Sequence, residues 1–151
     1  MQVLVTGGVG FVGSNLIEKL HKQGHEVISV DNYSTGKKEN EHSFCKYHNV
    51  DLQEYPLEYV KMEKPDIIYH FAAQSFPESS FKTPVSTLNT NVIGTTNLLE
   101  ELRLAQERIM LSPVIISVSS SEVYGNPEPD EVPIKETNPI RAANPYSISK
   151  V

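Results

Sequence analysis

Short apolar runs alternate with amphipathic stretches along most of the chain. Four of the runs are strongly apolar, and the one after Phe44 is weaker. Runs of this length, bounded by glycine, proline or polar clusters, are typical of buried strands. We expect strands at Val3–Thr6, Glu26–Val30, Phe44–Val50, Asp66–Phe71 and Val114–Val118.

Between these runs, apolar residues recur every three or four positions, which predicts helices. The first helix should cover Val12–Lys22 and stop at Gly24, with one apolar face made of Val12, Leu16, Ile17 and Leu20. A short helix is expected at Leu57–Met62. A long helix should begin at Pro84 and run to about Glu107, with an apolar face made of Val85, Leu88, Val92, Leu99 and Leu102.

The alternation of strands and helices determines the expected fold class. Consecutive strands joined by helices pair in parallel through right-handed crossovers. We therefore expect an α/β protein with a Rossmann-like, doubly wound parallel sheet, built as one domain over residues 1–151. Residues Gly125–Pro145 hold five prolines and several charges, which predicts a loop.

Composition excludes several classes of function. The net charge is −6, from 13 basic and 19 acidic residues, which argues against a non-specific nucleic-acid binder. No apolar run is long enough to cross a membrane. The single cysteine, Cys45, permits no internal disulfide, and the chain starts directly on an apolar strand without a signal-peptide pattern. We expect a cytoplasmic protein.

The first predicted strand leads into a glycine-rich turn, Thr6-Gly-Gly-Val-Gly-Phe-Val-Gly13. Glycines at 7, 10 and 13 let the backbone approach a pyrophosphate closely, and the next helix offers its free amides to the phosphates. A glycine trio alone is weak evidence, because glycines often serve only turns. Its place between a strand and a helix raises the weight of the pattern.

Asp31 ends the second strand at the spacing expected for the acid that binds a ribose. Its carboxylate would accept from both ribose hydroxyls and repel a 2′-phosphate, which favours NAD over NADP. Lys37 and Lys38 nearby weaken that preference. The alternative is that Asp31 is only a turn residue.

Tyr146 and Lys150 are four residues apart and would share one face of a helix. The ammonium would favour the phenolate of the tyrosine, which could then take a proton from a hydroxyl while hydride leaves for the cofactor. The cluster Ser119-Ser-Ser121-Glu122 follows the fifth strand, at the sheet edge where ligands bind. On its own the pair is more often a solvated helix face.

The whole chain resembles the extended short-chain dehydrogenase/reductases that modify nucleotide sugars. The resemblance rests on TGGVGFVGSNL, VDNYSTGKKEN, HFAAQS, NVIGTTNLLE, SSSEVYG and NPYSISK, in this order. It implies NAD as cofactor, a nucleotide-diphosphate sugar as substrate, no metal ion at the site, and a homodimer for full-length relatives.

The resemblance also assigns residues. Gly7, Gly10 and Gly13 would hold the pyrophosphate with Phe11 and Val12. Asp31 and Asn32 would hold the ribose, with Ser34, Thr35 and Gly36 beside it. Asp51 and Leu52 would flank the adenine, while Phe71, Ala72 and Ala73 line the strand edge below the cofactor. Asn91 would reach in from the long helix. Ser120, Tyr146 and Lys150 would be catalytic, with Tyr146 and Lys150 also contacting the cofactor. The plainer alternatives are that Phe71 and Leu52 belong to the core and that Asn91 bridges polar backbone.

The reaction within this family stays open. A 4-epimerase oxidises C4 of the sugar and returns hydride to the other face, whereas a 4,6-dehydratase needs a further base, which Glu122 would supply as in similar GDP-mannose 4,6-dehydratases. Similar reductases and decarboxylases also carry Ser-Glu-Val-Tyr-Gly, so Glu122 does not decide. HFAAQS and SFKTP favour the dehydratase, whereas VDNYSTGKKEN and Asp31 favour the 4-epimerase, which we rank slightly ahead.

Similar enzymes are longer and carry a substrate lobe after the region matched here. We therefore expect a fragment with a nearly complete cofactor site and an incomplete catalytic site. The alternatives are a non-catalytic NAD-binding module, or a half that associates with a complementing polypeptide.

Overall fold

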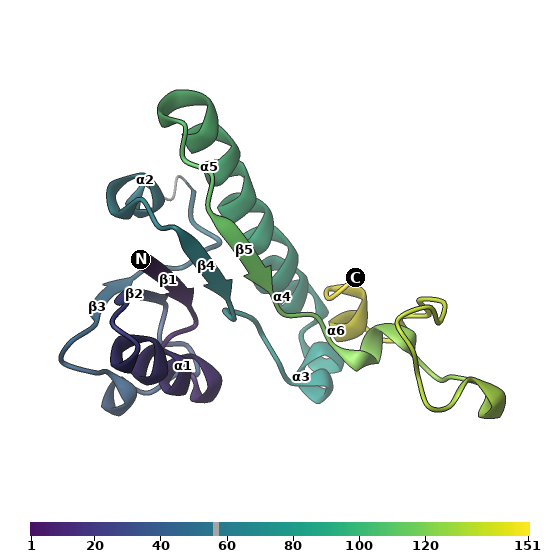
Figure 1. Ribbon diagram of the computed structural model, residues 1–151. Helices are drawn as coiled ribbons and strands as arrows, with labels where there is room; N and C mark the ends of the chain where they lie inside the picture. Colours follow the sequence, from purple (N-terminus) through teal and green to yellow (C-terminus); the bar gives the residue numbers. More distant parts are fainter. Residues whose placement is uncertain (56–57) are drawn as a thin grey trace.

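The computed structural model describes residues 1–55 and 58–151, and shows a parallel sheet with helices on both faces (Figure 1). Five strands in the described part of the chain lie in the order β3-β2-β1-β4-β5. All five predicted strands are confirmed, with ends that differ by at most two residues or so. Their bounds are β1 Gln2–Thr6, β2 Glu26–Asp31, β3 Lys46–Asn49, β4 Ile67–His70 and β5 Val114–Ser117.

The strand order confirms the Rossmann-like prediction. From β1 the chain builds outward through β2 and β3 on one side and through β4 and β5 on the other, and every neighbouring pair is parallel. The direction in which successive strands are added to the sheet therefore reverses between β1 and β4. In open parallel sheets, ligands bind outside the carboxyl ends of the strands at such a reversal.

Two apolar clusters pack on opposite faces of the sheet because side chains alternate along each strand. Leu4 of β1 packs in the cluster that the helices α2 (Tyr59–Glu63) and α5 (Gly94–Ile109) help to form. Val3 and Val5 pack on the other face, in the cluster of the helix α1 (Phe11–Lys22). Both faces near β1 are thus covered, which makes β1 the centre of the core.

The first helix begins one residue earlier than predicted, and its buried face is different. Ile17 and Leu20 are buried as expected, and Leu16 is half-buried. Val12 is 57% exposed, so its assignment to the apolar face is wrong. Gly13 lies instead against the backbone of Gly7 and Gly8 in the turn after β1, where its lack of a side chain permits close packing.

The long helix is interrupted. It consists of α4 (Pro84–Leu88), a π-helical turn (Asn89–Ile93) and α5. The predicted apolar face is wrong for Val85, Leu88, Val92 and Leu99, which are all exposed, and correct for Leu102. The buried side instead carries Thr87, Asn91, Gly94, Leu98 and Ala105. Most of these residues are small or polar, so this side of the helix packs against the protein and the side with the larger apolar residues faces solvent.

The short helix predicted at Leu57–Met62 is confirmed as α2, although Leu57 lies outside the described residues. A helix that the sequence pattern did not predict, α3 (Pro77–Lys82), follows β4, with Pro77 in its first turn. The loop predicted at Gly125–Pro145 is confirmed, apart from a 3₁₀ turn at Pro129–Glu131.

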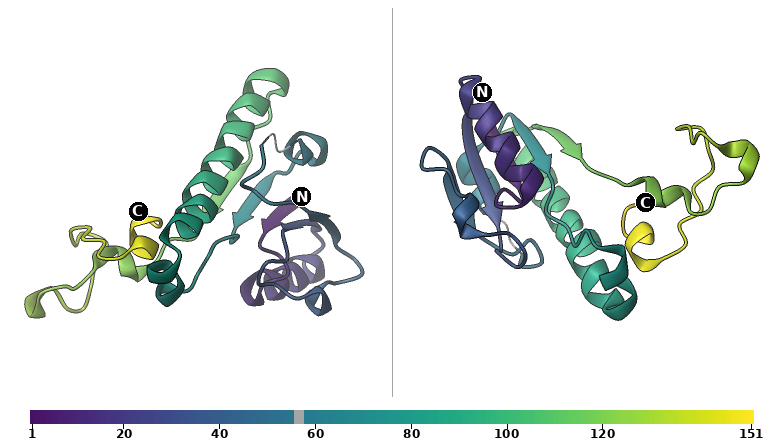
Figure 2. Two further views of the ribbon diagram at one scale, coloured as in Figure 1. Left: turned by 180° about the vertical axis from the view of Figure 1, so that it is seen from behind. Right: turned by 90° about the horizontal axis from the view of Figure 1, so that it is seen from below.

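The chain after this loop returns to the body of the protein. Its last helix, α6 (Pro145–Ile148), contacts α3 and α4, while the loop extends away from the sheet (Figure 2). The segment with Tyr146 and Lys150 is therefore brought back to the carboxyl ends of the strands.

Candidate functional site

A cavity of about 730 Å³ opens at the carboxyl ends of the strands, where the strand order reverses. Its volume lies within the range of roughly 300–1,000 Å³ that is usual for ligand and cofactor sites. It is bordered by residues from five of the six sequence motifs. NVIGTTNLLE contributes none, although Thr90, the residue before it, lines the cavity. The predicted site residues that line it are Gly7, Gly10, Phe11, Val12, Gly13, Asp31, Asn32, Ser34, Thr35, Gly36, Asp51, Leu52, Phe71, Ala72, Ala73, Tyr146 and Lys150.

The glycine-rich turn forms one wall of the cavity in a conformation that depends on glycine. Gly7 has a φ of +74°, and a Cβ there would lie 2.8 Å from the Ala72 nitrogen. A Cβ at position 13 would lie 2.3 Å from the Gly7 carbonyl oxygen. No side chain caps α1 at Gly10, so the amides of its first turn are available to an anion. The turn thus fits a pyrophosphate closely.

Asp31 lies at the end of β2 with its carboxylate held in place by the backbone. Its Oδ2 accepts from the Val9 N–H at 3.1 Å and its Oδ1 from the Tyr33 N–H at 2.8 Å. The side chain thus links the glycine-rich turn to the loop after β2. A fixed carboxylate beside the glycine-rich turn has the chemistry to accept hydrogen bonds from the two free hydroxyls of a ribose.

Asn32 and Asp51 hold the neighbouring edge of the cavity. The Asn32 amide donates to Asp51 Oδ2 at 3.0 Å, and the Gln53 N–H donates to Asp51 Oδ1 at 2.9 Å. Burial acts to raise the pKa of Asp51, but these hydrogen bonds outweigh it and hold the pKa below its usual value. Asp51 is therefore a carboxylate at neutral pH and accepts hydrogen bonds.

Leu52 and Phe71 fit both interpretations that the sequence left open. Leu52 is buried in the core cluster with Leu4, and Phe71 packs against the cluster on the other face. Both also line the cavity. They therefore contribute to the core and to an apolar wall at the same time.

Tyr146 and Lys150 belong to the C-terminal segment and Asp31 to the end of β2, and all three line the cavity. Tyr146 is in α6 and is 8% exposed, whereas Lys150 lies in the turn after α6. The prediction that both residues lie on one helix is thus correct only for Tyr146, yet both line the cavity.

Lys150 is tied to the end of β5. Its ammonium donates to the Val118 carbonyl at 3.1 Å, and its own carbonyl accepts from the Ser119 hydroxyl at 2.8 Å. Burial lowers the pKa of Lys150 because it disfavours the charged form.

Ser120 and Glu122, both predicted to be catalytic, do not line the cavity. The Ser120 hydroxyl accepts from the Glu122 N–H at 3.2 Å, and so caps the 3₁₀ turn Ser121–Tyr124. Glu122 Oε2 accepts from the amide of Asn144, the N-cap residue of α6, at 3.1 Å. Their proposed roles in chemistry stay predictions. In this structure Glu122 supports the start of α6.

Asn91, predicted to reach the cofactor, also lies behind the wall of the cavity. It is 5% exposed, and its amide bonds the backbone N–H and carbonyl of Gln74 and the hydroxyl of Ser149. These three bonds use both amide hydrogens and the oxygen. The plainer alternative, that Asn91 bridges polar backbone, describes what the structure shows.

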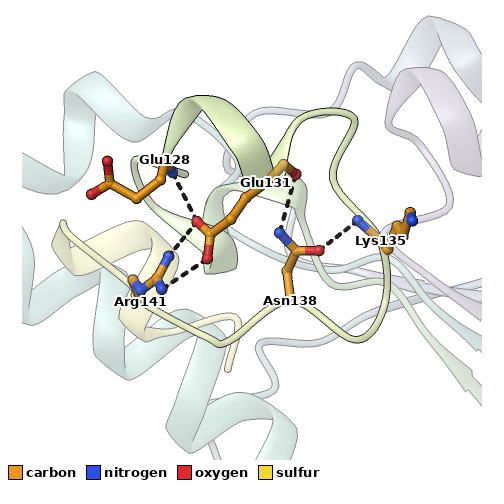
Figure 3. Close-up of polar contacts among 5 residues, drawn as sticks. All are labelled: Glu128, Glu131, Lys135, Asn138 and Arg141. Carbon is orange, nitrogen blue, oxygen red and sulfur yellow. Dashed lines mark hydrogen bonds and ion pairs between the residues drawn. The ribbon is translucent and has the colours of Figure 1, made fainter.

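The loop before α6 is closed by the carboxylate of Glu131 (Figure 3). Arg141 donates to it through both terminal nitrogens, at 2.6 and 2.9 Å, and the Glu128 N–H donates at 2.8 Å. Asn138 bonds the Glu131 carbonyl and accepts from the Lys135 N–H. The Arg141 ion pair lowers the pKa of Glu131. The loop therefore returns the chain to α6 along a defined path.

Several cavity residues were not predicted from the sequence. They come from the segment after β4, from α4 and the π-helical turn, and from the ends of β2, β3 and β5. A usable signal existed for the first group, because residues that directly follow a parallel strand lie at the carboxyl edge. The additional lining residues are Val30, Val50, Gln53, Gln74, Ser75, Phe76, Ser86, Thr90 and Val118. Ser119, which the sequence placed at the carboxyl edge of the sheet, also lines the cavity.

In residues 1–55 and 58–151, no group of three or more His, Cys, Asp or Glu side chains is arranged to hold a metal ion. None of the helices described is long and apolar enough to span a bilayer.

Comparison with known proteins relates this geometry to a family. The profile of the GDP-mannose 4,6 dehydratase family matches residues 4–151. A putative UDP-glucose 4-epimerase of Methanocaldococcus jannaschii is 35% identical over 149 residues, which is 98% of this chain and 47% of that protein. UDP-glucuronic acid decarboxylase 1 of Danio rerio is 40% identical over 127 residues, covering 84% of this chain and 29% of the relative.

The fold agrees with these sequence matches. The crystal structure of UDP-glucose 4-epimerase from Thermus thermophilus, in complex with NAD, superposes with a TM-score of 0.87 at 35% identity. The match covers 99% of this chain and 47% of that one. This chain therefore spans about half the length, or less, of the relatives it matches.

Proposed function

Since the chain belongs to the NAD-dependent nucleotide-sugar epimerase/dehydratase family, a group of extended short-chain dehydrogenase/reductases, we propose that it binds NAD and forms the cofactor half of an enzyme that oxidises C4 of a nucleotide sugar. The single observation that supports this proposal is one cavity that combines a glycine-walled turn, a backbone-held Asp31, and the pair Tyr146 and Lys150.

The residues of the cavity fit the parts of NAD in order. The glycine-rich turn and the first amides of α1 would hold the pyrophosphate. Asp31 would accept from the adenosine ribose hydroxyls, and its charge would oppose a 2′-phosphate. Asp51 would accept from the adenine amino group. Tyr146 and Lys150 would lie at the nicotinamide end.

NAD, when bound, would accept hydride from the sugar and return it later. The chain's own contribution would be the proton: the Tyr146 phenolate would take the proton of the C4 hydroxyl as hydride leaves, giving a 4-keto sugar. The Lys150 ammonium would favour that phenolate by its charge.

A 4-epimerase is the activity we rank first among the finer alternatives. The relative from M. jannaschii and the superposed T. thermophilus enzyme bear that name. Glu122 bonds Asn144 at the start of α6 and does not line the cavity, which supports ranking the 4-epimerase ahead of the dehydratase. A GDP-mannose 4,6-dehydratase, a decarboxylase or a related reductase is the second candidate, favoured by the matching family profile and by the Danio rerio enzyme.

Turnover by the 151 residues alone is not expected, because relatives are about twice as long and their remaining half is needed for the sugar. The chain could act as an NAD-binding module or pair with a complementing polypeptide. Thermal unfolding with and without NAD tests the core of the proposal. We expect millimolar NAD to raise the Tm and NADP to raise it less; no shift with NAD would refute it.

The reaction class needs a chain extended by the substrate lobe of a relative. In such a protein, Glu122→Gln should abolish a dehydratase but spare oxidation at C4, seen as NADH absorbance. An epimerase should tolerate the change, since glutamine can still accept from Asn144. Product analysis of UDP- and GDP-sugars would separate the two candidates.

A further inference from the structure

His70 lies at the carboxyl end of β4 and is 6% exposed, yet it belongs to no part of the proposed chemistry. Its imidazole lies between two threonine hydroxyls. Nδ1 is 2.7 Å from Thr6 Oγ1 of β1, and Nε2 is 2.9 Å from Thr95 Oγ1 of α5. The side chain therefore joins the central strand of the sheet to the long helix.

The neighbouring bonds determine the direction of each hydrogen bond. Thr95 Oγ1 donates its one hydrogen to the Asn91 carbonyl at 2.6 Å, so it must accept from His70 Nε2–H. Thr6 Oγ1 accepts from the Ala72 N–H at 3.1 Å, which leaves its hydroxyl hydrogen free for His70 Nδ1. Both assignments require the neutral imidazole with its proton on Nε2. Burial favours this form, because it lowers the pKa of His70 to about 4, with a smaller contribution from the charge of Lys150.

Thr95 acts on the π-helical turn that carries Asn91. The Gly94 N–H bonds the Asn89 carbonyl five residues earlier, the pattern of a π-helix. Such turns are widened, and their carbonyls lose regular partners. The Thr95 hydroxyl provides a partner for the Asn91 carbonyl, and His70 fixes the rotamer in which it does so.

Asn91 connects the π-helical turn to the segment that carries Tyr146. Its amide donates to Ser149 Oγ at 2.8 Å, and that hydroxyl donates to the Tyr146 carbonyl at 2.6 Å. The same amide accepts from and donates to the backbone of Gln74 in the cavity wall. One chain of hydrogen bonds thus runs from His70 through Thr95, Asn91 and Ser149 to Tyr146.

We propose that His70 is a positioning residue, which through Thr95 holds the π-helical turn in the form that aims Asn91 at Gln74 and Ser149 and thereby places Tyr146. The proposed function gives this positioning its purpose. The positioning itself does not depend on that function, since it can be measured without any reaction. A histidine that merely filled the core would stabilise the fold without controlling Asn91 or Tyr146.

Thr95→Val in the 151-residue chain tests the proposal, because it removes the hydroxyl and keeps the shape. Thr96→Val is the matched control: Thr96 makes the same bond to a carbonyl four residues earlier, at 2.8 Å to Val92, but on the exposed side. Thr95→Ser keeps the hydroxyl. The readouts are the side-chain amide NMR signals of Asn91, the ring signals of Tyr146 (assigned with Tyr146→Phe), and the Kd for NAD.

We expect Thr95→Val to shift the NMR signals of Asn91 and Tyr146 and to raise the Kd for NAD roughly fivefold, the loss typical of one hydrogen bond. Thr96→Val and Thr95→Ser should leave both near the values of the unmodified chain. If Thr95→Val does not fold, His70→Gln, which keeps a donor toward Thr95, should preserve the signals better than His70→Leu.

The proposal is overturned if Thr95→Val moves the Asn91 and Tyr146 signals no more than Thr96→Val does. Failure of the proposed function is a separate result. In that case the unmodified chain would not bind NAD, while the NMR comparison would still decide whether His70 and Thr95 position Tyr146.

Discussion

Acid should destabilise this fold through His70. The imidazole is 6% exposed, and burial holds its pKa at about 4, compared with 6.5 in an unfolded chain. Between these two pH values the unfolded state takes up a proton that the folded state does not. Stability is therefore fully present above pH 6.5 and is lost as the pH falls toward 4.

The size of the effect follows from the two pKa values. A separation of this size corresponds to about 3.4 kcal/mol when the titration is complete, at about 1.36 kcal/mol per pH unit. Between pH 7 and pH 5, linkage gives a loss of about 2 kcal/mol from this one group. That is a large part of the stability of a domain of this size.

Urea unfolding followed by far-UV circular dichroism measures this loss at pH 7 and pH 5. His70→Gln cannot take up the proton, so its free energy of unfolding should fall by about 2 kcal/mol less than that of the unmodified chain. His21→Gln, at an exposed position of α1, is the control and should keep the steep fall because His70 is still present. Equal pH dependence in the unmodified chain and in His70→Gln would refute a buried, neutral His70.

Three further predictions concern the cavity and α6. Gly13→Ala should weaken the affinity for NAD at least tenfold in calorimetric titration, because its Cβ would meet the Gly7 carbonyl at 2.3 Å. Gly24→Ala is the control, since nothing lies within 4 Å of its Cβ. It should lower the free energy of unfolding by only about 1 kcal/mol, at its φ of +81°, and leave the affinity for NAD unchanged. Asp31→Asn should weaken the affinity of the chain for NAD and narrow its preference for NAD over NADP, since the charge that opposes a 2′-phosphate is gone. Competition between the two cofactors measures this, and an unchanged ratio of their Kd values would contradict the role of Asp31. Asn144→Ala should cost about 1 kcal/mol in urea unfolding, because it removes the cap on the Ser147 N–H and the bond to Glu122. An unchanged free energy of unfolding would mean that neither bond stabilises the fold.

Local sequence patterns were sufficient to predict the sheet and the part of the cavity formed by the glycine-rich turn and Asp31. Four of the five strands lie in apolar runs, whereas β3 (KYHN) does not. Asp31 and the glycine-rich turn lie at strand ends, where topology alone brings them together. The motif resemblance also placed Tyr146 and Lys150 correctly in the same cavity.

The interior face of the long helix could not be predicted in this way. Apolar periodicity pointed to Val85, Leu88, Val92 and Leu99, whereas the sheet and the loops meet the side with Asn91 and Leu98. Choosing between two stripes requires knowledge of hydrogen-bond partners far away in the sequence, such as Gln74 and Ser149 for Asn91. The same holds for Glu122, whose partner Asn144 lies 22 residues away across an irregular loop.

The placement of β1 at the centre of the sheet has a consequence for how the molecule is made. Its register with β2 joins positions 24 apart, Gln2 with Glu26, whereas its register with β4 joins Val3 with Ile67. Closing the longer loop costs about 0.9 kcal/mol more entropy. During synthesis the β1-α1-β2 unit should therefore form early. The part of the cavity proposed to hold the adenosine would then exist before β4 has left the ribosome.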